Sequence, residues 1–134
     1  YGPEGLTEVM GTVDYFINVI PNTPETKKMI GEKELSVMKP TAFFINIGRG
    51  ESVDEEALIR VLKERKIAGA GLDVFRREPL PEDSPFWDLD NVLITPHVGG
   101  FSNVYADQAL PIFEENLSRF LKGERKGLIN LIEL

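Results

Sequence analysis

The amino-acid sequence predicts an α/β fold, in which a doubly wound parallel sheet is followed by a long C-terminal helix. Short apolar segments alternate with amphipathic ones, the connections between them are short, and polar or glycine-rich residues follow most apolar segments. This alternation is typical of parallel strand–helix–strand units, because strands covered on both faces read as nearly continuous apolar runs.

The first half of the sequence contains two expected strands. Residues 14–20 are aromatic and β-branched and run into a proline-rich turn, which is the pattern of a mostly buried strand. We expect a brief helix within 24–31 and another turn or two of helix over 32–38. Residues 41–47 form the second strand, which leads straight into a Gly-Arg-Gly run where glycine permits a tight backbone path.

The second half continues the alternation. From Asp54, which can cap a first turn, apolar residues recur at helical intervals and predict an amphipathic helix. Residues 67–75 form a third strand, whose small residues suggest that a helix or a ligand packs closely on the backbone. A proline-rich connection leads to a fourth strand over 91–95. After Ser102 we expect a long helix that Pro111 kinks or splits, since an interior proline costs about 3 kcal/mol.

Composition excludes several classes of protein. The chain has 134 residues, fewer than the roughly 150 of an average domain, and should form one compact unit at most. The net charge of −7 disfavours general nucleic-acid binding. Cysteine is absent and His97 is the single histidine, so we expect no disulfide and no metal site. No apolar run is long enough for a membrane span and the start lacks the pattern of a signal peptide, so we expect a cytoplasmic protein.

Polar candidates for a functional site lie where the expected strands end. Arg49 follows the second strand, Asp73 lies near the end of the third, and His97 follows the fourth. Ligands of parallel α/β sheets bind beyond the carboxyl ends of the strands. Taken singly, each residue also has a plainer interpretation: a surface ion pair for Arg49, a turn cap for Asp73 and a loop histidine bonded to backbone for His97.

Four ordered motifs carry a resemblance that covers almost the whole chain. They are residues 45–50 (Ile-Asn-Ile-Gly-Arg-Gly), 53–58 (Val-Asp-Glu-Glu-Ala-Leu), 71–75 (Gly-Leu-Asp-Val-Phe) with Glu78-Pro79, and 95–97 (Thr-Pro-His). In order and spacing they resemble the D-isomer-specific 2-hydroxyacid dehydrogenase family. The resemblance implies a partial Rossmann-type sheet. Residues 1–98 would form the C-terminal half of an NAD(P)-binding domain, and residues 99–134 the helix that returns towards the substrate domain.

The family resemblance also implies catalytic roles that agree with the chemistry of the side chains. Arg49 would hold the substrate, since a guanidinium binds a carboxylate and the neighbouring keto oxygen with directional hydrogen bonds. His97 would move the proton, because an ordinary imidazole, with a pKa near 6.5, acts in both proton directions. Glu78 would orient the imidazole and stabilise its protonated form.

The cofactor implied by the resemblance is NAD or NADP, and the chain does not contain the position that distinguishes them. Asp73 would accept a hydrogen bond from the nicotinamide carboxamide. The other residues expected to contact the cofactor lie in the same loops: Ile20 and Pro21 on the adenine side, Ile47, Gly48 and Arg49 along it, and His97, Gly99 and Gly100 near the nicotinamide.

Some features of a dinucleotide site are missing from this sequence. No Gly-x-Gly-x-x-Gly run occurs between a first strand and helix, and no acidic residue follows at the spacing that reads the ribose. We therefore expect a fragment of an oxidoreductase that acts on a small D-2-hydroxy or 2-keto acid, inactive alone. The first strand then lacks a neighbour, so we expect self-association, as a homodimer.

Two alternatives stay open at this point. One is a non-catalytic relative that keeps the fold as a nucleotide-sensing or protein-binding module, and the other is an oligomerisation piece of unrelated function. The identity of the substrate also stays open among glyoxylate, hydroxypyruvate, phosphoglycerate and lactate-type acids.

Overall fold

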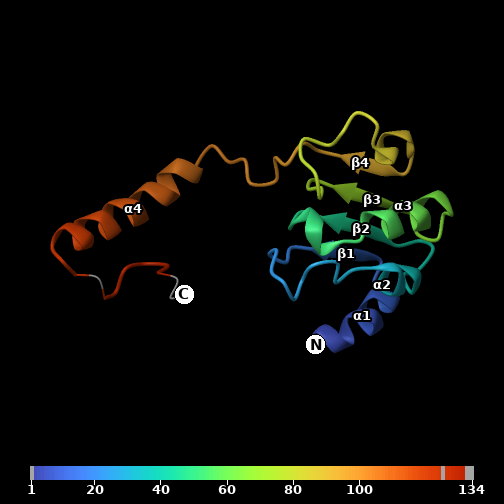
Figure 1. Cartoon of the computed structure of the whole chain (residues 1–134), viewed down its shortest axis with the longest axis horizontal. Helices are drawn as coiled ribbons and strands as arrows, with labels where there is room; N and C mark the ends of the chain where they lie inside the picture. Colours follow the sequence, from blue (N-terminus) through green and yellow to red (C-terminus); the bar gives the residue numbers. More distant parts are fainter. Residues whose placement is uncertain (1, 125, 132–134) are drawn as a thin grey trace. The chain divides into compact units, whose positions relative to one another are not determined.

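The computed structural model describes residues 2–124 and 126–131, and the chain divides into two units, Tyr1–Gly99 and Gly100–Leu134 (Figure 1). Among the described residues, the first unit contains all the strands and three α-helices: α1 (Leu6–Thr12), β1 (Tyr15–Asn18), α2 (Glu32–Ser36), β2 (Phe43–Asn46), α3 (Glu55–Lys63), β3 (Gly69–Leu72) and β4 (Val92–Ile94). The second contains one long helix, α4 (Tyr105–Leu121). Short 3-10 turns lie at Pro3–Gly5, Gly50–Ser52 and Pro85–Asp88.

The four strands form one parallel sheet in the order β1-β2-β3-β4. Asn18 pairs with Asn46, Asn46 with Leu72, and Leu72 with Ile94, so the carboxyl ends of all four strands are in register. This confirms the expected α/β fold with a parallel sheet and a long C-terminal helix. Residues that follow these strands are therefore brought to one edge of the sheet.

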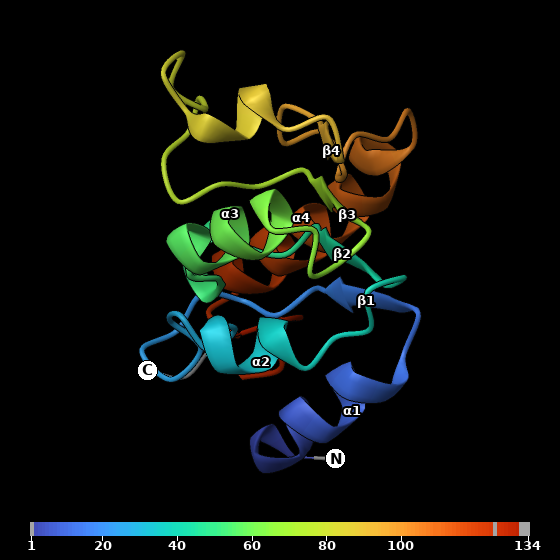
Figure 2. The ribbon, with the colours of Figure 1, turned by 90° about the vertical axis from the view of Figure 1, so that its right-hand side faces the viewer.

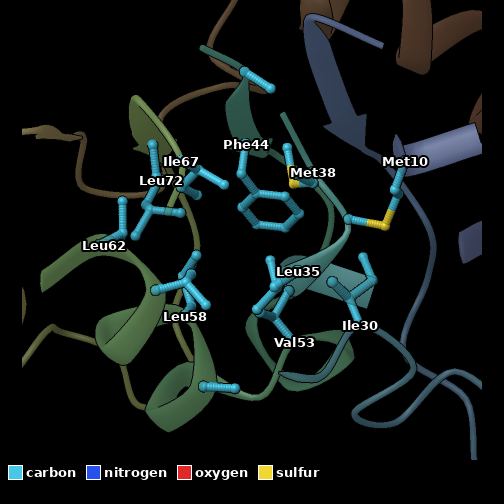
Figure 3. Close-up of a cluster of buried hydrophobic side chains, with 14 of the residues drawn as sticks. Met10, Ile30, Leu35, Met38, Phe44, Val53, Leu58, Leu62, Ile67 and Leu72 are labelled. Atoms are coloured by element: carbon cyan, nitrogen blue, oxygen red, sulfur yellow. The ribbon is translucent and has the colours of Figure 1, made fainter. Parts of the chain in front are cut away.

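The hydrophobic core lies between one face of the sheet and the short helices (Figures 2 and 3). Phe44 of β2 is fully buried and lies between side chains from α2 and α3, Leu35 and Leu58 among them. Met10 of α1 is also fully buried and joins the same cluster. The side chains that alternate inward along the strands thus determine which face the helices cover.

The opposite face of the sheet carries exposed apolar side chains. Tyr15 is 65% exposed and Ile17 is 55% exposed, and the Tyr15 ring stacks on Phe43 with centroids 5.7 Å apart. Gly69 pairs with Phe43, and a Cβ there would lie 2.5 Å from the carbonyl oxygen of Asn91 and 3.2 Å from the Phe43 ring. Gly69 therefore leaves space for the loop at Asn91 and for the Phe43 ring of the neighbouring strand. The sequence predicts instead that the small residues of this strand leave space for a helix or a ligand.

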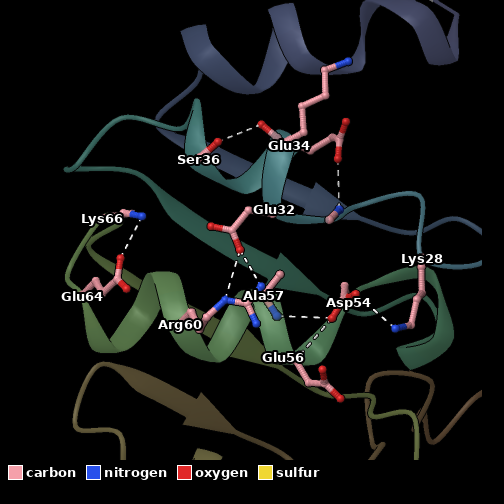
Figure 4. A network of polar contacts seen from close by, with 12 residues as sticks. Lys28, Glu32, Glu34, Ser36, Asp54, Glu56, Ala57, Arg60, Glu64 and Lys66 are labelled. Carbon is pink, nitrogen blue, oxygen red and sulfur yellow. Dashed lines mark hydrogen bonds and ion pairs between the residues drawn. The ribbon is translucent and has the colours of Figure 1, made fainter.

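Helix α3 begins where the sequence predicts. Asp54 Oδ1 accepts hydrogen bonds from the backbone N–H groups of Glu56 and Ala57, each at 3.2 Å, and so caps the first turn (Figure 4). Arg60, one turn further on, pairs with Glu32 of α2 at 2.6 Å. Pairs this exposed contribute little stability, so the helix is held mainly by its buried apolar face.

The helix expected within residues 24–31 is wrong. The segment forms turns, because the Thr26 hydroxyl donates to the carbonyl of Pro21 at 2.7 Å and accepts from the backbone N–H of Thr23 at 2.8 Å. Threonine hydroxyls that bond nearby backbone compete with helix formation. Lys28, with φ of 51°, leaves the helical region altogether.

Two further elements differ from the sequence pattern. Helix α1 was not anticipated, since the segment is short and Gly11 lowers helix propensity. Helix α4 continues through Pro111 without being split. The side chains of α4 are exposed or half-buried, so solvent can bond the carbonyl that the proline leaves unpaired. Within the described residues, no helix is long and apolar enough to cross a membrane.

Neighbouring phenylalanines of β2 test the assignment of the two faces. We expect Phe44→Ala to lower the free energy of unfolding by about 3–5 kcal/mol, because it opens a cavity in the core. Phe43→Ala should lower the free energy of unfolding by about 1 kcal/mol or less, because Phe43 is 40% exposed on the other face. Denaturant unfolding followed by fluorescence of Trp87, the single tryptophan, measures both variants. Equal losses would contradict the assignment.

Candidate active site

Backbone hydrogen bonds continue between neighbouring chain segments for one residue beyond the ends of the strands. The N–H of Ile47 donates to the carbonyl of Asn18 at 3.1 Å, and the N–H of Asp73 donates to the carbonyl of Asn46 at 3.0 Å. Thr95 donates in the same way to Leu72 at 3.0 Å. The backbones that carry the candidate residues are thus fixed side by side at the carboxyl edge.

A buried polar network supports the loop that carries Arg49. The Asn18 amide donates to Asn46 Oδ1 at 2.9 Å and to the hydroxyl of Ser52 at 2.7 Å. The Ser52 hydroxyl donates in turn to the carbonyl of Arg49 at 2.6 Å, and the Asn46 amide reaches the same oxygen at 3.3 Å. Asn46 Oδ1 also accepts from the N–H of Gly48 at 3.2 Å. Because these amides are buried and hydrogen-bonded, they hold the loop in one conformation.

Gly50 fixes the distance between this loop and the next one. A Cβ at this position would lie 1.9 Å from the carbonyl carbon of Phe75, so only glycine allows the two backbones to approach this closely. The Arg49 guanidinium donates to the carbonyl of Gly48 at 2.7 Å. Arg49 makes no ion pair with any described residue, which removes the surface ion pair as an explanation for it.

His97 pairs with Glu78 rather than with backbone. Its Nδ1 lies 2.7 Å from Glu78 Oε2, and the other oxygen of Glu78 accepts the backbone N–H of Phe75 at 2.9 Å. Nε2 of His97 makes no hydrogen bond to any described residue. One ring nitrogen is thus held by a carboxylate, and the other makes no hydrogen bond within the described residues.

Glu78 is held as a carboxylate by its neighbours. Burial opposes its ionisation, but hydrogen bonds from His97 and from the N–H of Phe75 outweigh this, as do the charges of His97 and Arg49. Together they lower the pKa of Glu78 below its ordinary value. The negative charge opposite Nδ1 is therefore present at neutral pH.

Asp73 anchors the turn on which His97 lies. His97 has φ of 54°, in the left-handed region that residues with a Cβ rarely adopt. The Asp73 carboxylate accepts three hydrogen bonds from this turn: Thr95 Oγ1 at 2.5 Å and Val98 N at 2.9 Å bond Oδ1, and Gly99 N at 2.8 Å bonds Oδ2. The carboxylate therefore offsets the cost of the strained backbone.

The same contacts govern the ionisation of Asp73, which is only 5% exposed. Burial opposes the negative charge, yet the hydrogen bonds from Thr95, Val98 and Gly99 and the nearby His97 outweigh it. The pKa of Asp73 is accordingly lowered from its ordinary value of 3.8.

Arg49, Glu78 and His97 line one cavity of about 260 Å³, which Gly50, Glu51, Phe75 and Arg76 complete. The three residues lie far apart in the sequence. The structure therefore brings together a guanidinium, a carboxylate and an imidazole with one free ring nitrogen. Such a set can bind a small carboxylate and exchange a proton with it.

Several of the residues expected to contact a dinucleotide lie in the loops that follow the strands of the first unit. A Cβ on Gly48 would lie 2.8 Å from the carbonyl oxygen of Ile20, so glycine permits these two loops to touch. Pro21 and Ile47 are exposed next to them. Asp73 Oδ2 accepts one hydrogen bond from the described residues, and a carboxylate oxygen can accept a second, such as one from a carboxamide N–H. Gly99 ends the first unit and Gly100 begins the second.

Comparison with protein families decides what kind of domain this is. Residues 1–99 match the model of the D-isomer specific 2-hydroxyacid dehydrogenase, NAD binding domain. The chain belongs to this family. The loops that carry Arg49, Glu78 and His97 all lie within the matched residues, so the family and the site geometry describe the same part of the chain.

Relatives of this family member include glyoxylate reductase from Pyrococcus furiosus, 46% identical over 119 residues, which are 89% of this chain and 35% of the relative. Glyoxylate/hydroxypyruvate reductase B from Pectobacterium carotovorum is 44% identical over 121 residues, 90% of this chain and 38% of the relative. The chain thus spans about a third of the length of these curated relatives.

Solved structures show the same arrangement. A D-isomer specific 2-hydroxyacid dehydrogenase from Xanthobacter autotrophicus Py2, in complex with NADPH and MES, superposes with a TM-score of 0.87 at 38% identity. The superposition covers 97% of this chain and 52% of that one. The likeness extends over nearly all of this family member, strands and helices included.

Sequence reasoning missed the residues that support the site. Asn18, Asn46 and Ser52 orient the Arg49 loop, and Thr95 bonds the carboxylate that anchors His97. A signal for the first two was present, since each is a lone amide near the end of an apolar strand, where an unpaired polar group would be costly.

Replacing Asp73 by asparagine tests its role in holding the His97 turn. Asparagine has a single carbonyl oxygen, and its NH2 group would face a donor, so it cannot accept at both positions. We therefore expect the free energy of unfolding to fall by about 2–3 kcal/mol at neutral pH. Because the pKa of Asp73 is lower folded than unfolded, its contribution is complete above about pH 5 and is lost as pH falls through the folded value. Denaturant unfolding from pH 7 to 3 should therefore show the difference shrinking. A difference independent of pH would contradict the role.

Proposed function

We propose that this chain supplies the catalytic residues and part of the nucleotide site of an oxidoreductase that interconverts small D-2-hydroxy acids and 2-keto acids with NAD or NADP. The observation that carries the proposal is the single cavity of about 260 Å³ lined by Arg49, Glu78 and His97. Glyoxylate and hydroxypyruvate are the substrates we infer, because the relatives in Pyrococcus and Pectobacterium are reductases named for them.

Arg49 binds and orients the substrate. Arg49 lines the cavity, and its loop is fixed by the Asn18–Asn46–Ser52 network. A planar fork of donors holds the carboxylate and the adjacent keto oxygen in one plane. The reacting carbon is then presented to His97 in a constant orientation.

His97 exchanges the proton. During reduction, Nε2 donates a proton to the keto oxygen while a hydride is added to the carbon, and the product is the 2-hydroxy acid. In the reverse direction Nε2 accepts the hydroxyl proton. Glu78 Oε2, 2.7 Å from Nδ1, stabilises the protonated ring. By bonding Nδ1 it also orients the ring, so that Nε2 points away from Glu78.

A nicotinamide dinucleotide supplies or accepts the hydride in this reaction. Within this chain, Ile20, Pro21, Ile47 and Gly48 would contact the cofactor at the edge of the sheet, with Gly99 and Gly100 near its nicotinamide. Asp73 would bond the carboxamide. We propose in addition that the protein is cytoplasmic and binds neither nucleic acid nor membrane. The net charge of −7 supports the first of these two absences, because nucleic-acid phosphates attract positively charged surfaces.

A chimera tests the catalytic assignment. The matching 119 residues of the Pyrococcus furiosus glyoxylate reductase are replaced by this chain, and NAD(P)H oxidation by glyoxylate is followed. We expect turnover in the chimera and none from the chain alone. His97→Ala should lower kcat/KM by about 10²–10⁴-fold, because general acid–base catalysis is lost.

The matched control for the chimera is Lys63→Ala, at the exposed end of α3 away from the carboxyl edge, which should leave kcat/KM unchanged. Glu78→Gln should lower kcat and alter its pH profile. An active chimera in which His97→Ala leaves kcat/KM unchanged would contradict the assignment and favour the non-catalytic sensing or protein-binding module.

We also propose that the chain self-associates as a homodimer. Strand β1 lies at the edge of the sheet, and Tyr15 and Ile17 expose apolar surface beside it. Sedimentation should show dimer, and Ile17→Lys should shift it to monomer. Leu93→Lys, at the other edge, is the control and should remain dimeric. A clean monomer of the unmodified chain at high concentration would contradict the proposal.

A further inference from the structure

A second cavity, of about 500 Å³, is also lined by the His97–Glu78 pair. Its walls are mainly apolar and come from Phe75, Leu80 and Trp87 and from Ile94 of β4. The volume lies within the range of about 300–1,000 Å³ that holds small molecules in proteins. All of its lining residues belong to the first unit, so the cavity is a feature of that unit alone.

The two cavities meet at the catalytic pair. Phe75, Glu78 and His97 contribute to the linings of both. Consider a substrate whose carboxylate lies at Arg49 and whose reacting carbon lies at His97. The side chain attached to that carbon can then extend into the apolar cavity. The site as a whole has a small polar end and a larger apolar end.

Trp87 gives the apolar cavity a rigid flat wall. Its indole N–H donates to the carbonyl of Pro81 at 2.8 Å, which fixes the ring, and the adjacent Phe86 is buried in the core. Trp87 nonetheless remains 53% exposed. A fixed aromatic surface left partly open is suited to offset stacking with another ring.

The two carboxylates at the edge of the cavity already have partners. Asp73 accepts three hydrogen bonds from the His97 turn, and Glu78 is bonded by His97 and by the N–H of Phe75. The cavity therefore offers a ligand mainly apolar contact area and few further hydrogen bonds. An apolar, flat group gains most from such a surface, since burying it displaces water from apolar walls.

We propose that the apolar cavity is a substrate subsite that receives an aromatic side chain, so that the site accepts aryl-substituted 2-keto and 2-hydroxy acids as well as glyoxylate. This inference rests on the proposed function, because the position of the carboxylate at Arg49 places the attached ring. Trp87 and Ile94 are the specificity-determining residues.

Binding measured by NMR on the full chain tests the subsite. The chain has one histidine and one tryptophan, so the signals of the His97 ring and of the Trp87 indole N–H are assigned without ambiguity. Glycolate and D-3-phenyllactate are both monoanionic 2-hydroxy acids that differ by a benzyl group. We expect glycolate to shift the His97 signals alone. D-3-phenyllactate should shift both residues and bind at least tenfold more tightly.

Matched variants localise the gain. Trp87→Ala, read on His97, and Ile94→Ala should each reduce the affinity for D-3-phenyllactate several-fold and leave that for glycolate unchanged. Leu93→Ala, the neighbour on β4 that does not line the cavity and is 71% exposed, should change neither. Arg49→Ala should weaken both acids.

Several outcomes would overturn the subsite. D-3-phenyllactate binding no more tightly than glycolate, or a gain that survives both Trp87→Ala and Ile94→Ala, would do so. Benzyl alcohol binding as tightly as D-3-phenyllactate, with no effect of Arg49→Ala on either, would show a separate apolar site instead. By contrast, glycolate binding that ignores Arg49→Ala contradicts the proposed function itself, whatever the Trp87 variants show.

Discussion

The candidate site depends most on one carboxylate, that of Asp73. It accepts hydrogen bonds from Thr95, Val98 and Gly99 and so encloses the turn in which His97 adopts φ of 54°. Without these contacts the backbone of His97 would relax towards a commoner conformation. The imidazole would then lose its alignment with Glu78. Asp73 thereby positions the residue to which the proton transfer is assigned, in addition to the cofactor contact proposed for it.

The parallel register of the sheet is what makes a common site possible. Asn18, Asn46, Leu72 and Ile94 are paired across the four strands, so the loops that follow start from the same edge. Two close contacts then fix these loops to each other: the buried amide network below Arg49, and the approach of Gly50 to Phe75. The geometry of the site therefore follows from backbone pairing first and from side-chain contacts second.

The His97–Glu78 pair borders two environments of opposite character. It lines both the small cavity with Arg49 and the larger apolar cavity with Trp87. An anionic head and an apolar tail would be favoured on opposite sides of one reacting carbon. Under the proposed function, substrate preference is in this way coupled to the pair to which the proton transfer is assigned.

The sequence by itself determined the class of fold and the order of the strands along the chain, because apolar periodicity is a local property of the chain. Arg49 and His97 stood out at the ends of expected strands, and the family resemblance added Glu78 to them. It failed where local rules compete, as in residues 24–31, where threonine hydroxyls bond the backbone and replace the expected helix. Only the tertiary structure decided that Asn18, Ser52 and Thr95 support the site and that an apolar cavity adjoins it. These facts depend on distances between residues remote in sequence, which packing sets and no local pattern records.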